Sequence, residues 1–460
     1  MKKVFFYFIL LLPVSVFAQA TDMYFDKAVE LYGNKDYNGA LDYFSKEIAL
    51  NPNNIEAYNY RGIIKSQLGD SRGAISDFSK EIAMNPQAYM AYSNRGNEKN
   101  ILQDYKGAIE DCDRAIGLNP KCDLAYNNRG NSKNHLNEFK EAIADFDRAI
   151  EINPKLEIAY NNRGNSKNGL GDYKGAIADF NKAIELNPQF AEAYLNIGLS
   201  KIALNDNNGA LDEFNKVIEL NPKAEAAFTL RGIIKSDQND YTGALADFDQ
   251  AILLNPRYAQ AYAGRGALKA KMNNYGDAND DLTKAIILNP QYAEAYYNRA
   301  ETKLKLHDND GATEDLTKAI AADPKSSMAY HDRGCIKLAS NDFAGAMADF
   351  TKAIEINADN KTPRNNANSA KSYYMRGLSR LALNNLAGAT ADMTKTIELD
   401  PKSGDAYNIR GKLYFMQKKT DAARADWTKA AGLGNQNAIS ELQLLKPKKT
   451  THPAGWVEWQ

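Results

Sequence analysis

The sequence predicts an all-α protein, an α-solenoid of stacked helix-turn-helix repeats, and three periodic observations carry that prediction. Asn-Pro or Asp-Pro pairs recur every 34 residues from Asn51-Pro52 to Asp323-Pro324. An alanine stands twelve residues before each of these prolines, and an aromatic or apolar residue usually follows that alanine four residues later. A column of glycines keeps the same period. Self-similarity at a fixed period of about 20–50 residues is typical of repeat proteins, in which each unit packs on the next.

The N-terminus comes first along the chain and has the pattern of a secretory signal. Lys2 and Lys3 precede an apolar run of 14 residues from Val4 to Phe17, which is short for a membrane span. The small residue Ala18 fits a cleavage site, so we predict a signal peptide at residues 1–18. We therefore expect an exported protein, periplasmic or extracellular, with no integral membrane span.

Each 34-residue unit that follows predicts two helices joined by short turns. Proline ends the second helix, because it lacks a backbone N–H and restricts the residue before it. The glycine and alanine columns allow paired helices to approach closely, and the large apolar column fills the core between them. The unit is therefore a helix pair that buries its apolar face against its neighbours.

This period and these columns resemble the tetratricopeptide repeat. Twelve units run from about Thr21 to Asn437, so the resemblance covers nearly the whole chain after the signal. It implies two antiparallel helices per unit and a right-handed superhelix whose concave groove is lined by the first helices. It also implies a non-enzymatic scaffold that binds a protein or an extended peptide.

The period also predicts where the array is interrupted and where it ends. We expect ten tandem repeats over 21–357, a polar insertion at 358–366 and two further repeats over 367–437. The nine extra residues are either a joint or a passive loop. A capping helix is predicted at 438–445, where it would cover the last apolar face, and 446–460 is predicted to be disordered.

An arginine replaces the family's usual leucine before the glycine in ten of the twelve repeats. Each of these ten repeats has an aspartate 16 residues later, and the two repeats without the arginine also lack the aspartate. We predict ion pairs that bridge the two helices of one repeat, such as Arg129 with Asp145 and Arg163 with Asp179. A planar guanidinium suits a partly buried bidentate contact. The alternative is an array of anion-binding sites.

Asparagine is concentrated in the segment YNNRGNSKN, which occurs at Tyr126–Asn134 and again at Tyr160–Asn168. Asparagine is a poor residue for a helix interior, yet the flanking segments are helical in pattern. The resemblance implies that these residues face or border the groove. An amide donates and accepts, so a ladder of asparagines would pair with the backbone of an extended peptide. The candidate peptide-binding residues are Asn94, Asn97, Asn127, Asn128, Asn131, Asn134, Asn161, Asn162, Asn165, Asn168, Asn196 and Asn298. The alternative is recent internal duplication, with asparagine kept as a harmless solvated residue.

Charge and motifs argue against several other functions. The 57 basic and 58 acidic residues give a net charge of −1, so bulk charge favours neither nucleic acid nor an anionic membrane. The sequence has no HExxH, GxSxG or phosphate-loop signature, and its four histidines lack a paired metal spacing. We expect no enzyme, no metal and no cofactor. A disulfide between Cys112 and Cys122 stays open at this point, and Cys335 is left over.

The leading functional hypothesis is a scaffold that holds a partner protein or extended polypeptide in its groove, in cell-envelope assembly or secretion. The alternative is a self-assembling structural oligomer of the periplasm. The sequence does not indicate the partner or the oligomeric state, because fold alone does not determine either.

Overall fold

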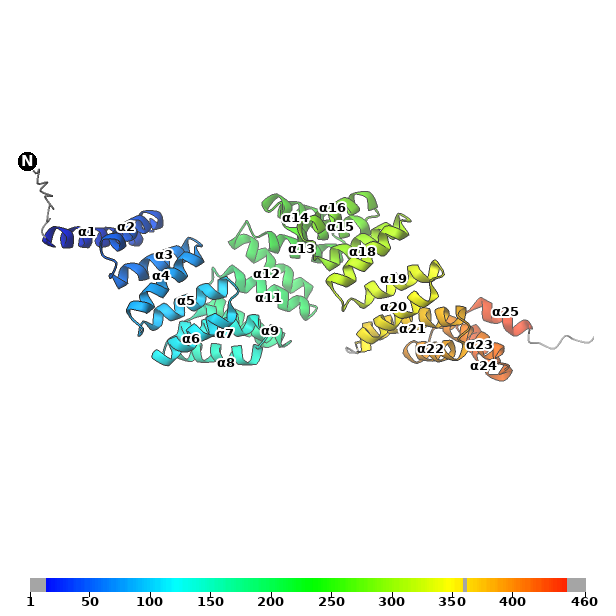
Figure 1. Cartoon of the computed structure of the whole chain (residues 1–460). Helices are drawn as coiled ribbons and strands as arrows, with labels where there is room; N and C mark the ends of the chain where they lie inside the picture. Colours follow the sequence, from blue (N-terminus) through cyan, green and yellow to red (C-terminus); the bar gives the residue numbers. More distant parts are fainter. Residues whose placement is uncertain (1–13, 359–361, 445–460) are drawn as a thin grey trace, which may run out of the picture. The chain divides into compact units, whose positions relative to one another are not determined.

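The computed structural model describes residues 14–358 and 362–444, and these ranges contain helices and turns but no strand (Figure 1). The described helices are α1 (Val14–Gly33), α2 (Tyr37–Leu50), α3 (Ile55–Gln67), α4 (Ser71–Met84), α5 (Tyr89–Ile101), α6 (Tyr105–Leu118), α7 (Asp123–His135), α8 (Phe139–Ile152), α9 (Glu157–Gly169), α10 (Tyr173–Leu186), α11 (Ala191–Ala203), α12 (Asn207–Leu220), α13 (Glu225–Asp237), α14 (Tyr241–Leu254), α15 (Ala259–Lys271), α16 (Tyr275–Leu288), α17 (Ala293–Lys305), α18 (Asn309–Ala322), α19 (Ser327–Ala339), α20 (Phe343–Ala358), α21 (Pro363–Ala382), α22 (Leu386–Leu399), α23 (Gly404–Met416), α24 (Thr420–Gly432) and α25 (Gln436–Leu444). The chain is all-α with its helices in stacked pairs, as the sequence predicts.

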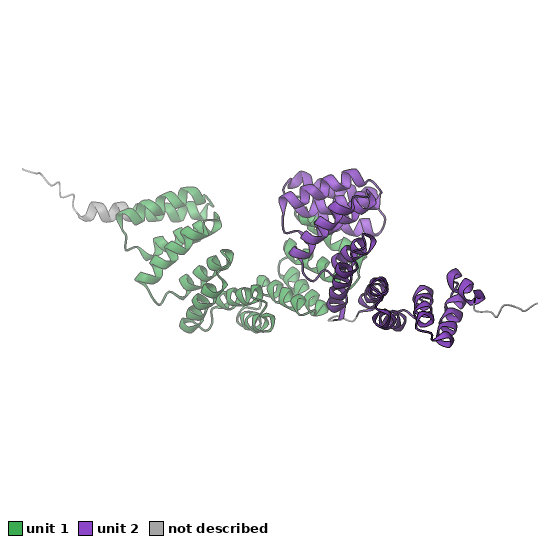
Figure 2. Ribbon diagram, turned by 45° about the vertical axis from the view of Figure 1, so that its right-hand side comes forward, with its two compact units in different colours: residues 1–227 green, residues 228–460 purple. Residues whose placement is uncertain are grey.

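The helices belong to two compact units, one ending at Ala227 and the other beginning at Phe228 (Figure 2). Within each unit, consecutive helices pair and each pair packs on the next, as α3 does with α4 in the first unit and α19 with α20 in the second. In each pair we call the odd-numbered member the first helix and the even-numbered member the second helix. No helix in the described ranges has the length and apolarity needed to cross a membrane.

The turn inside each repeat is set by one residue in the left-handed region. Gly69 has φ +81°, its N–H donates to the carbonyl of Ser66, and the next N–H, of Asp70, donates to the carbonyl of Lys65. This is the pattern that ends helices at a left-handed residue. Asp70 then caps α4, because its carboxylate accepts from the N–H of Gly73 at 2.9 Å.

The turn between repeats is set by the Asn-Pro pair. Asn85 ends α4, and its side-chain oxygen accepts from the N–H of Gln87 at 3.1 Å. Such a local contact fixes a turn without help from other elements. The same contact to the residue two positions on recurs at Asn119, Asn153, Asn187, Asn221, Asn255, Asn289, Asp323 and Asp400.

The core is a single layer between the helices of each repeat and its neighbours. The alanine column is fully buried, and so are the large apolar residues four positions later, such as Phe146 and Phe180. The glycine column is needed for this packing, because a methyl group on Gly164 would lie 2.5 Å from a ring carbon of Phe180. The core therefore repeats once per unit and has no single centre.

The insertion is helical over part of its length. Helix α20 continues to Ala358, and α21 begins at Pro363, with the Thr362 hydroxyl accepting from the N–H of Asn365. Helix α21 has 20 residues, against 13 in a regular first helix such as α19. Residues 363–366, at the end of the predicted insertion, form the first turn of this longer helix.

The predicted ends of the chain are described in part. Helix α25 occupies the place of the predicted capping helix, and its Ala438 is buried in a cluster with Trp427. The predicted disordered tail, 446–460, lies outside the described residues, as do residues 1–13 of the predicted signal peptide.

Candidate functional site

A guanidinium–carboxylate clamp joins the two helices of a repeat. The Nε of Arg163 donates to Oδ2 of Asp179 at 2.9 Å, and its Nη2 donates to Oδ1 at 2.6 Å. Arg129 makes the same bidentate contact with Asp145. Eight more repeats have this pair: Arg61–Asp77, Arg95–Asp111, Arg231–Asp247, Arg265–Asp281, Arg299–Asp315, Arg333–Asp349, Arg376–Asp392 and Arg410–Asp426.

The clamp also reaches the preceding repeat, which the sequence analysis did not anticipate. Nη1 of Arg129 donates to Oδ1 of Asp113, on the second helix of the repeat before, at 2.6 Å. Lys133 adds a second cation to Asp145 at 2.7 Å, and the guanidinium of Arg129 lies 5.4 Å from the ring centroid of Tyr126. Burial opposes the charge of Arg129, but hydrogen bonds to Asp145 and Asp113 outweigh it and raise the pKa of the guanidinium. With Nε, Nη1 and Nη2 all engaged, this arginine holds repeats together instead of presenting charge to a ligand.

Many of the candidate asparagines are also engaged between repeats, in two rows. In the first row, Nδ2 of Asn162 donates to Oδ1 of Asn127 at 3.1 Å, and Nδ2 of Asn196 donates to Oδ1 of Asn161 at 3.0 Å. Asn128 starts this row by donating to the carbonyl of Ser93 at 3.2 Å. Each of these bonds joins the first helices of consecutive repeats.

The second row lies at the other end of the same helices. The hydroxyl of Ser166 donates to Oδ1 of Asn134 at 3.0 Å, and Nδ2 of Asn168 donates to the hydroxyl of Ser200 at 2.9 Å. Ser132 pairs in the same way with Asn100, at 2.6 Å. The two rows explain many of the asparagines in this region, because each amide of a row has a partner on the first helix of a neighbouring repeat.

The twelve candidates therefore divide into two groups. Asn127 and Asn161 are only 4% and 1% exposed, so they have almost no surface to offer a ligand. Asn128, Asn134, Asn162, Asn168 and Asn196 are partly exposed but hydrogen-bonded in the two rows.

The second group is half-buried and largely unpaired. Asn131 and Asn165 make no side-chain hydrogen bond to the described part of the chain, and the same holds for Asn94 and Asn298. Asn97 makes a long contact of 3.3 Å to Oε1 of the adjacent Glu98. We call Asn131 and Asn165 the open asparagines, because they occupy the same position on consecutive first helices, α7 and α9.

The surroundings of the open asparagines are mixed. Leu199 holds the equivalent position on α11 and is 41% exposed. His135 is exposed beside them and stacks on Tyr105 with ring centroids 4.8 Å apart. The face formed by these first helices therefore combines unpaired amides with apolar surface.

The described residues contain three free thiols. Burial raises the pKa of Cys112 to about 12, and burial also raises the pKa of Cys335, to about 11. Cys122 is buried too, and the structure has no disulfide between it and Cys112. Across residues 14–358 and 362–444, no group of three His, Cys, Asp or Glu is placed to hold a metal ion.

Comparison with known families decides what this repeat is. Models of the tetratricopeptide repeat match 91–122, 124–156, 158–190, 191–224, 265–327, 329–360 and 374–438, more than half of the chain together. The chain belongs to the tetratricopeptide repeat family. This is a family of non-enzymatic interaction scaffolds with protein or peptide partners, so the chain is a protein-interaction scaffold. No curated protein matches the sequence.

Solved structures of the same kind are distant in sequence. A chain of the APC/C hetero-tetramer Cut9–Hcn1 is 14% identical, with 92% of this chain and 96% of that chain covered and a TM-score of 0.49. Yeast Tom70 is 19% identical over 93% and 96%, with a TM-score of 0.41. A tetratricopeptide repeat protein from Parabacteroides merdae is 23% identical over 54% and 99%, with a TM-score of 0.46. At these values the likenesses assign no function to this chain.

Proposed function

We propose that this scaffold holds an extended polypeptide along the first helices of repeats three to six, α5, α7, α9 and α11. The observation that supports the proposal is the pair of open asparagines, Asn131 and Asn165, which are unpaired while the asparagines around them are paired. A side-chain amide carries two N–H donors and an oxygen acceptor. An extended peptide presents the complementary C=O and N–H groups, whatever its side chains are.

The two hydrogen-bonded rows pre-organise this face. Asn131 lies three residues after Asn128, in the first row, and three residues before Asn134, in the second. Residues at this spacing share one side of a helix, so the open asparagine stands between two fixed contacts. A binding group held in place before the ligand arrives loses less freedom on binding.

Affinity from the amides alone is modest. Each hydrogen bond contributes about 0.5–1.5 kcal/mol net, so two asparagines alone hold a peptide weakly. The exposed Leu199 offers apolar contact at the next position along the face. A partner with an extended backbone and an apolar side chain near one end suits this arrangement.

The test begins with short random peptides selected on the full chain, whose affinity is then measured by fluorescence anisotropy. Changing both Asn131 and Asn165 to alanine should weaken binding about tenfold, which corresponds to about 1.4 kcal/mol. N-methylation of the peptide backbone should have a similar effect, because it removes the donors that the amides bind.

The matched control changes two exposed asparagines outside this face, Asn53 and Asn309, to alanine. Circular dichroism checks that both variants fold. Equal affinity for the wild type, the control and the Asn131/Asn165 variant would reject the proposed face.

We also propose that the chain is exported and acts in cell-envelope assembly or secretion. This part rests on the basic and apolar residues of 1–18. Mass spectrometry of the protein from an envelope fraction should find a mature N-terminus at Gln19. An intact N-terminus on a cytoplasmic protein would reject export.

A further inference from the structure

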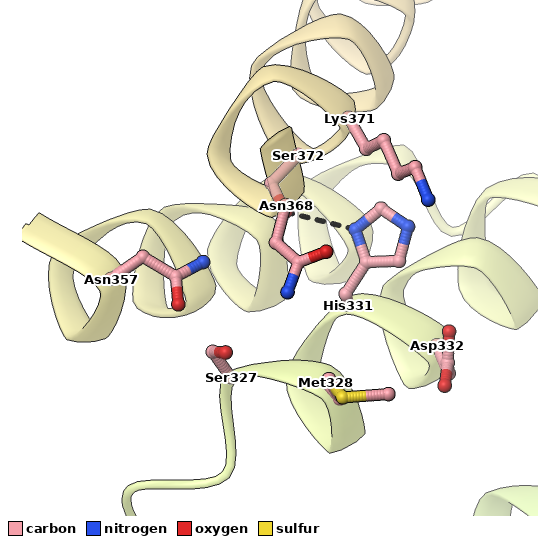
Figure 3. Close-up of a pocket in the computed structure, with 8 residues that line it drawn as sticks. All are labelled: Ser327, Met328, His331, Asp332, Asn357, Asn368, Lys371 and Ser372. Carbon is pink, nitrogen blue, oxygen red and sulfur yellow. Dashed lines mark hydrogen bonds between the residues drawn. The ribbon is translucent and has the colours of Figure 1, made fainter. Parts of the chain in front are cut away.

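A small polar pocket lies in the second unit, where α19, α20 and the lengthened α21 meet (Figure 3). The cavity has a volume of about 160 Å³. Its walls are Ser327, Met328, His331, Asp332, Asn357, Asn368, Lys371 and Ser372. The volume suits one side chain of a ligand better than a segment of main chain.

Asn357 is the most informative wall residue. It stands in the Asn-Pro column, where residues such as Asn289 accept from the N–H two positions on, here Gln291 at 3.1 Å. No proline follows Asn357, because Ala358 takes that place, and α20 continues through it. Helix α20 therefore runs past the position at which the second helix of the other repeats ends.

The Asn357 side chain is nine-tenths buried yet makes no hydrogen bond to a described residue. It is 5% exposed, makes no side-chain contact of that kind within the described residues, and points into the pocket in Figure 3. Its amide atoms open onto the pocket, since they are not among the fully buried side-chain atoms that lack a partner in the described ranges. A ligand that enters the pocket therefore meets a donor and an acceptor that no described residue occupies.

Two more polar groups face the pocket without partners. Asn368 comes from the turns that the insertion adds to α21, and Ser327 begins α19. Neither makes a side-chain hydrogen bond in the described ranges. His331 and Ser372, in contrast, already bond to each other at 2.9 Å.

The charges around the pocket balance. Lys371 and Asp332 stand on the two sides of His331 (Figure 3), and Asp332 accepts from the hydroxyl of Tyr297 at 2.7 Å. Burial lowers the pKa of His331, and Lys371 lowers it further against the opposing effect of Asp332, so the imidazole is neutral at pH 7. The groups at the pocket that lack a partner among the described residues are thus two amides, a hydroxyl and the exposed ammonium of Lys371.

Two facing amides select a ligand that both donates and accepts. A carboxylate would accept from their N–H groups but would place an anion against their oxygens. An ammonium would donate to their oxygens but would leave their N–H groups without an acceptor. A carboxamide pairs with both. We propose that this pocket binds the carboxamide side chain of a glutamine or asparagine in a polypeptide ligand.

A larger cavity of about 590 Å³ adjoins the pocket and shares His331 and Lys371 with it. Its other walls include Pro363, Tyr374 and Leu399, so it offers apolar room for the rest of a ligand. The identity of the ligand as a polypeptide rests on the proposed function, whereas the carboxamide preference rests on the pocket alone.

The test uses saturation-transfer NMR on the full chain with four amino acids as N-acetyl methylamides: glutamine, glutamate, lysine and norleucine. The caps are the same in all four, so differences report the side chain. Glutamine should bind about tenfold more tightly than each of the others. Asn368→Ala, at a half-buried position, and Asn357→Ala should each remove this preference, and Asn289→Ala should leave it unchanged.

Preference for glutamate would overturn the inference in favour of an anion site at Lys371. Equal binding of all four, or none, would overturn it as well. The proposed function is tested separately, because selected peptides without glutamine or asparagine should still depend on Asn131 and Asn165. Failure in only one experiment therefore rejects only one of the two proposals.

Discussion

Asparagine behaves differently in the regular repeats of the first unit and beside the insertion in the second. Asn127 and Asn162 are 35 residues apart and bond to each other, as do other pairs at the same spacing. Asn357 and Asn368 lie where the period is broken, and both lack a partner among the described residues. Regular repetition supplies the amides of the two rows with partners on the next repeat. Asn131 and Asn165 in the same repeats, and Asn357 and Asn368 beside the insertion, are left available for a ligand.

The largest effect is expected from breaking the clamp that keeps the repeats in register. Asp145→Ala leaves Arg129 and Lys133 partly buried without their shared carboxylate. We expect a loss of about 3–5 kcal/mol in the free energy of unfolding, because a buried charge has lost its counter-charge. Urea unfolding followed by circular dichroism measures this loss.

The control is Asp113→Ala, which removes the 54% exposed partner of the same arginine. It should cost less than about 1 kcal/mol. Similar losses for the two variants would mean that the clamp does not hold the helices of a repeat together.

A smaller effect is expected for the paired asparagines. Asn161→Ala removes an acceptor from Asn196 and a donor to Glu192, so it should destabilise the chain by about 1–3 kcal/mol. Asn165→Ala, one turn later in α9, should change the free energy by less than about 0.5 kcal/mol. An equal loss of stability for Asn161→Ala and Asn165→Ala, measured by thermal unfolding, would contradict the distinction between paired and open asparagines.

Beside the insertion, a substitution is expected to change the free energy of unfolding in the opposite direction. Asn357→Leu replaces an unpaired buried amide by an apolar group of similar shape, which should be neutral or should stabilise the chain by up to about 1 kcal/mol. The same change at Asn161 should destabilise it. A clear loss of stability in Asn357→Leu would show that the Asn357 amide has a partner.

The smallest effect on stability is expected when His331 is protonated at low pH. Burial lowers its pKa in the folded chain below the ordinary value of 6.5, so the unfolded chain takes up protons first. The contribution of His331 is therefore complete above this value and is lost as the pH falls below it. Asp332 and Lys371 oppose each other, which keeps the effect small.

Thermal unfolding of the wild type and His331→Asn, at about pH 7.5 and about pH 5.5, measures this effect. The wild type should lose more stability on acidification than the variant. An equal response to pH in the two proteins would contradict a neutral, buried His331.

The regular part of the fold is open to prediction from sequence because both partners of a contact fall in fixed columns. The 34-residue period predicts the helix pairs, and the spacing of 16 residues brings Arg163 to Asp179. The contact from Nη1 of the arginine to the preceding repeat could also have been predicted from the sequence. Ser, Thr or Asp stands 16 residues before most of these arginines, as Asp113 does before Arg129.

The sites could be predicted only in part. Asn127 and Asn131 are four residues apart in one helix and look alike in sequence, but the neighbouring helix buries the first and leaves the second open. The pocket needs three helices to meet and an insertion that lengthens one of them, which no column shows. The missing proline at Ala358 and the nine extra residues of 358–366 were its signals in the sequence.

A crystal structure of the full chain with a selected peptide tests the division between paired and open asparagines most directly. We predict that Asn131 and Asn165 bond to N–H and C=O groups of the peptide backbone, while the bond from Asn162 to Asn127 stays intact. A peptide bound away from α7 and α9, or one that displaces the Asn162–Asn127 bond, would contradict the account.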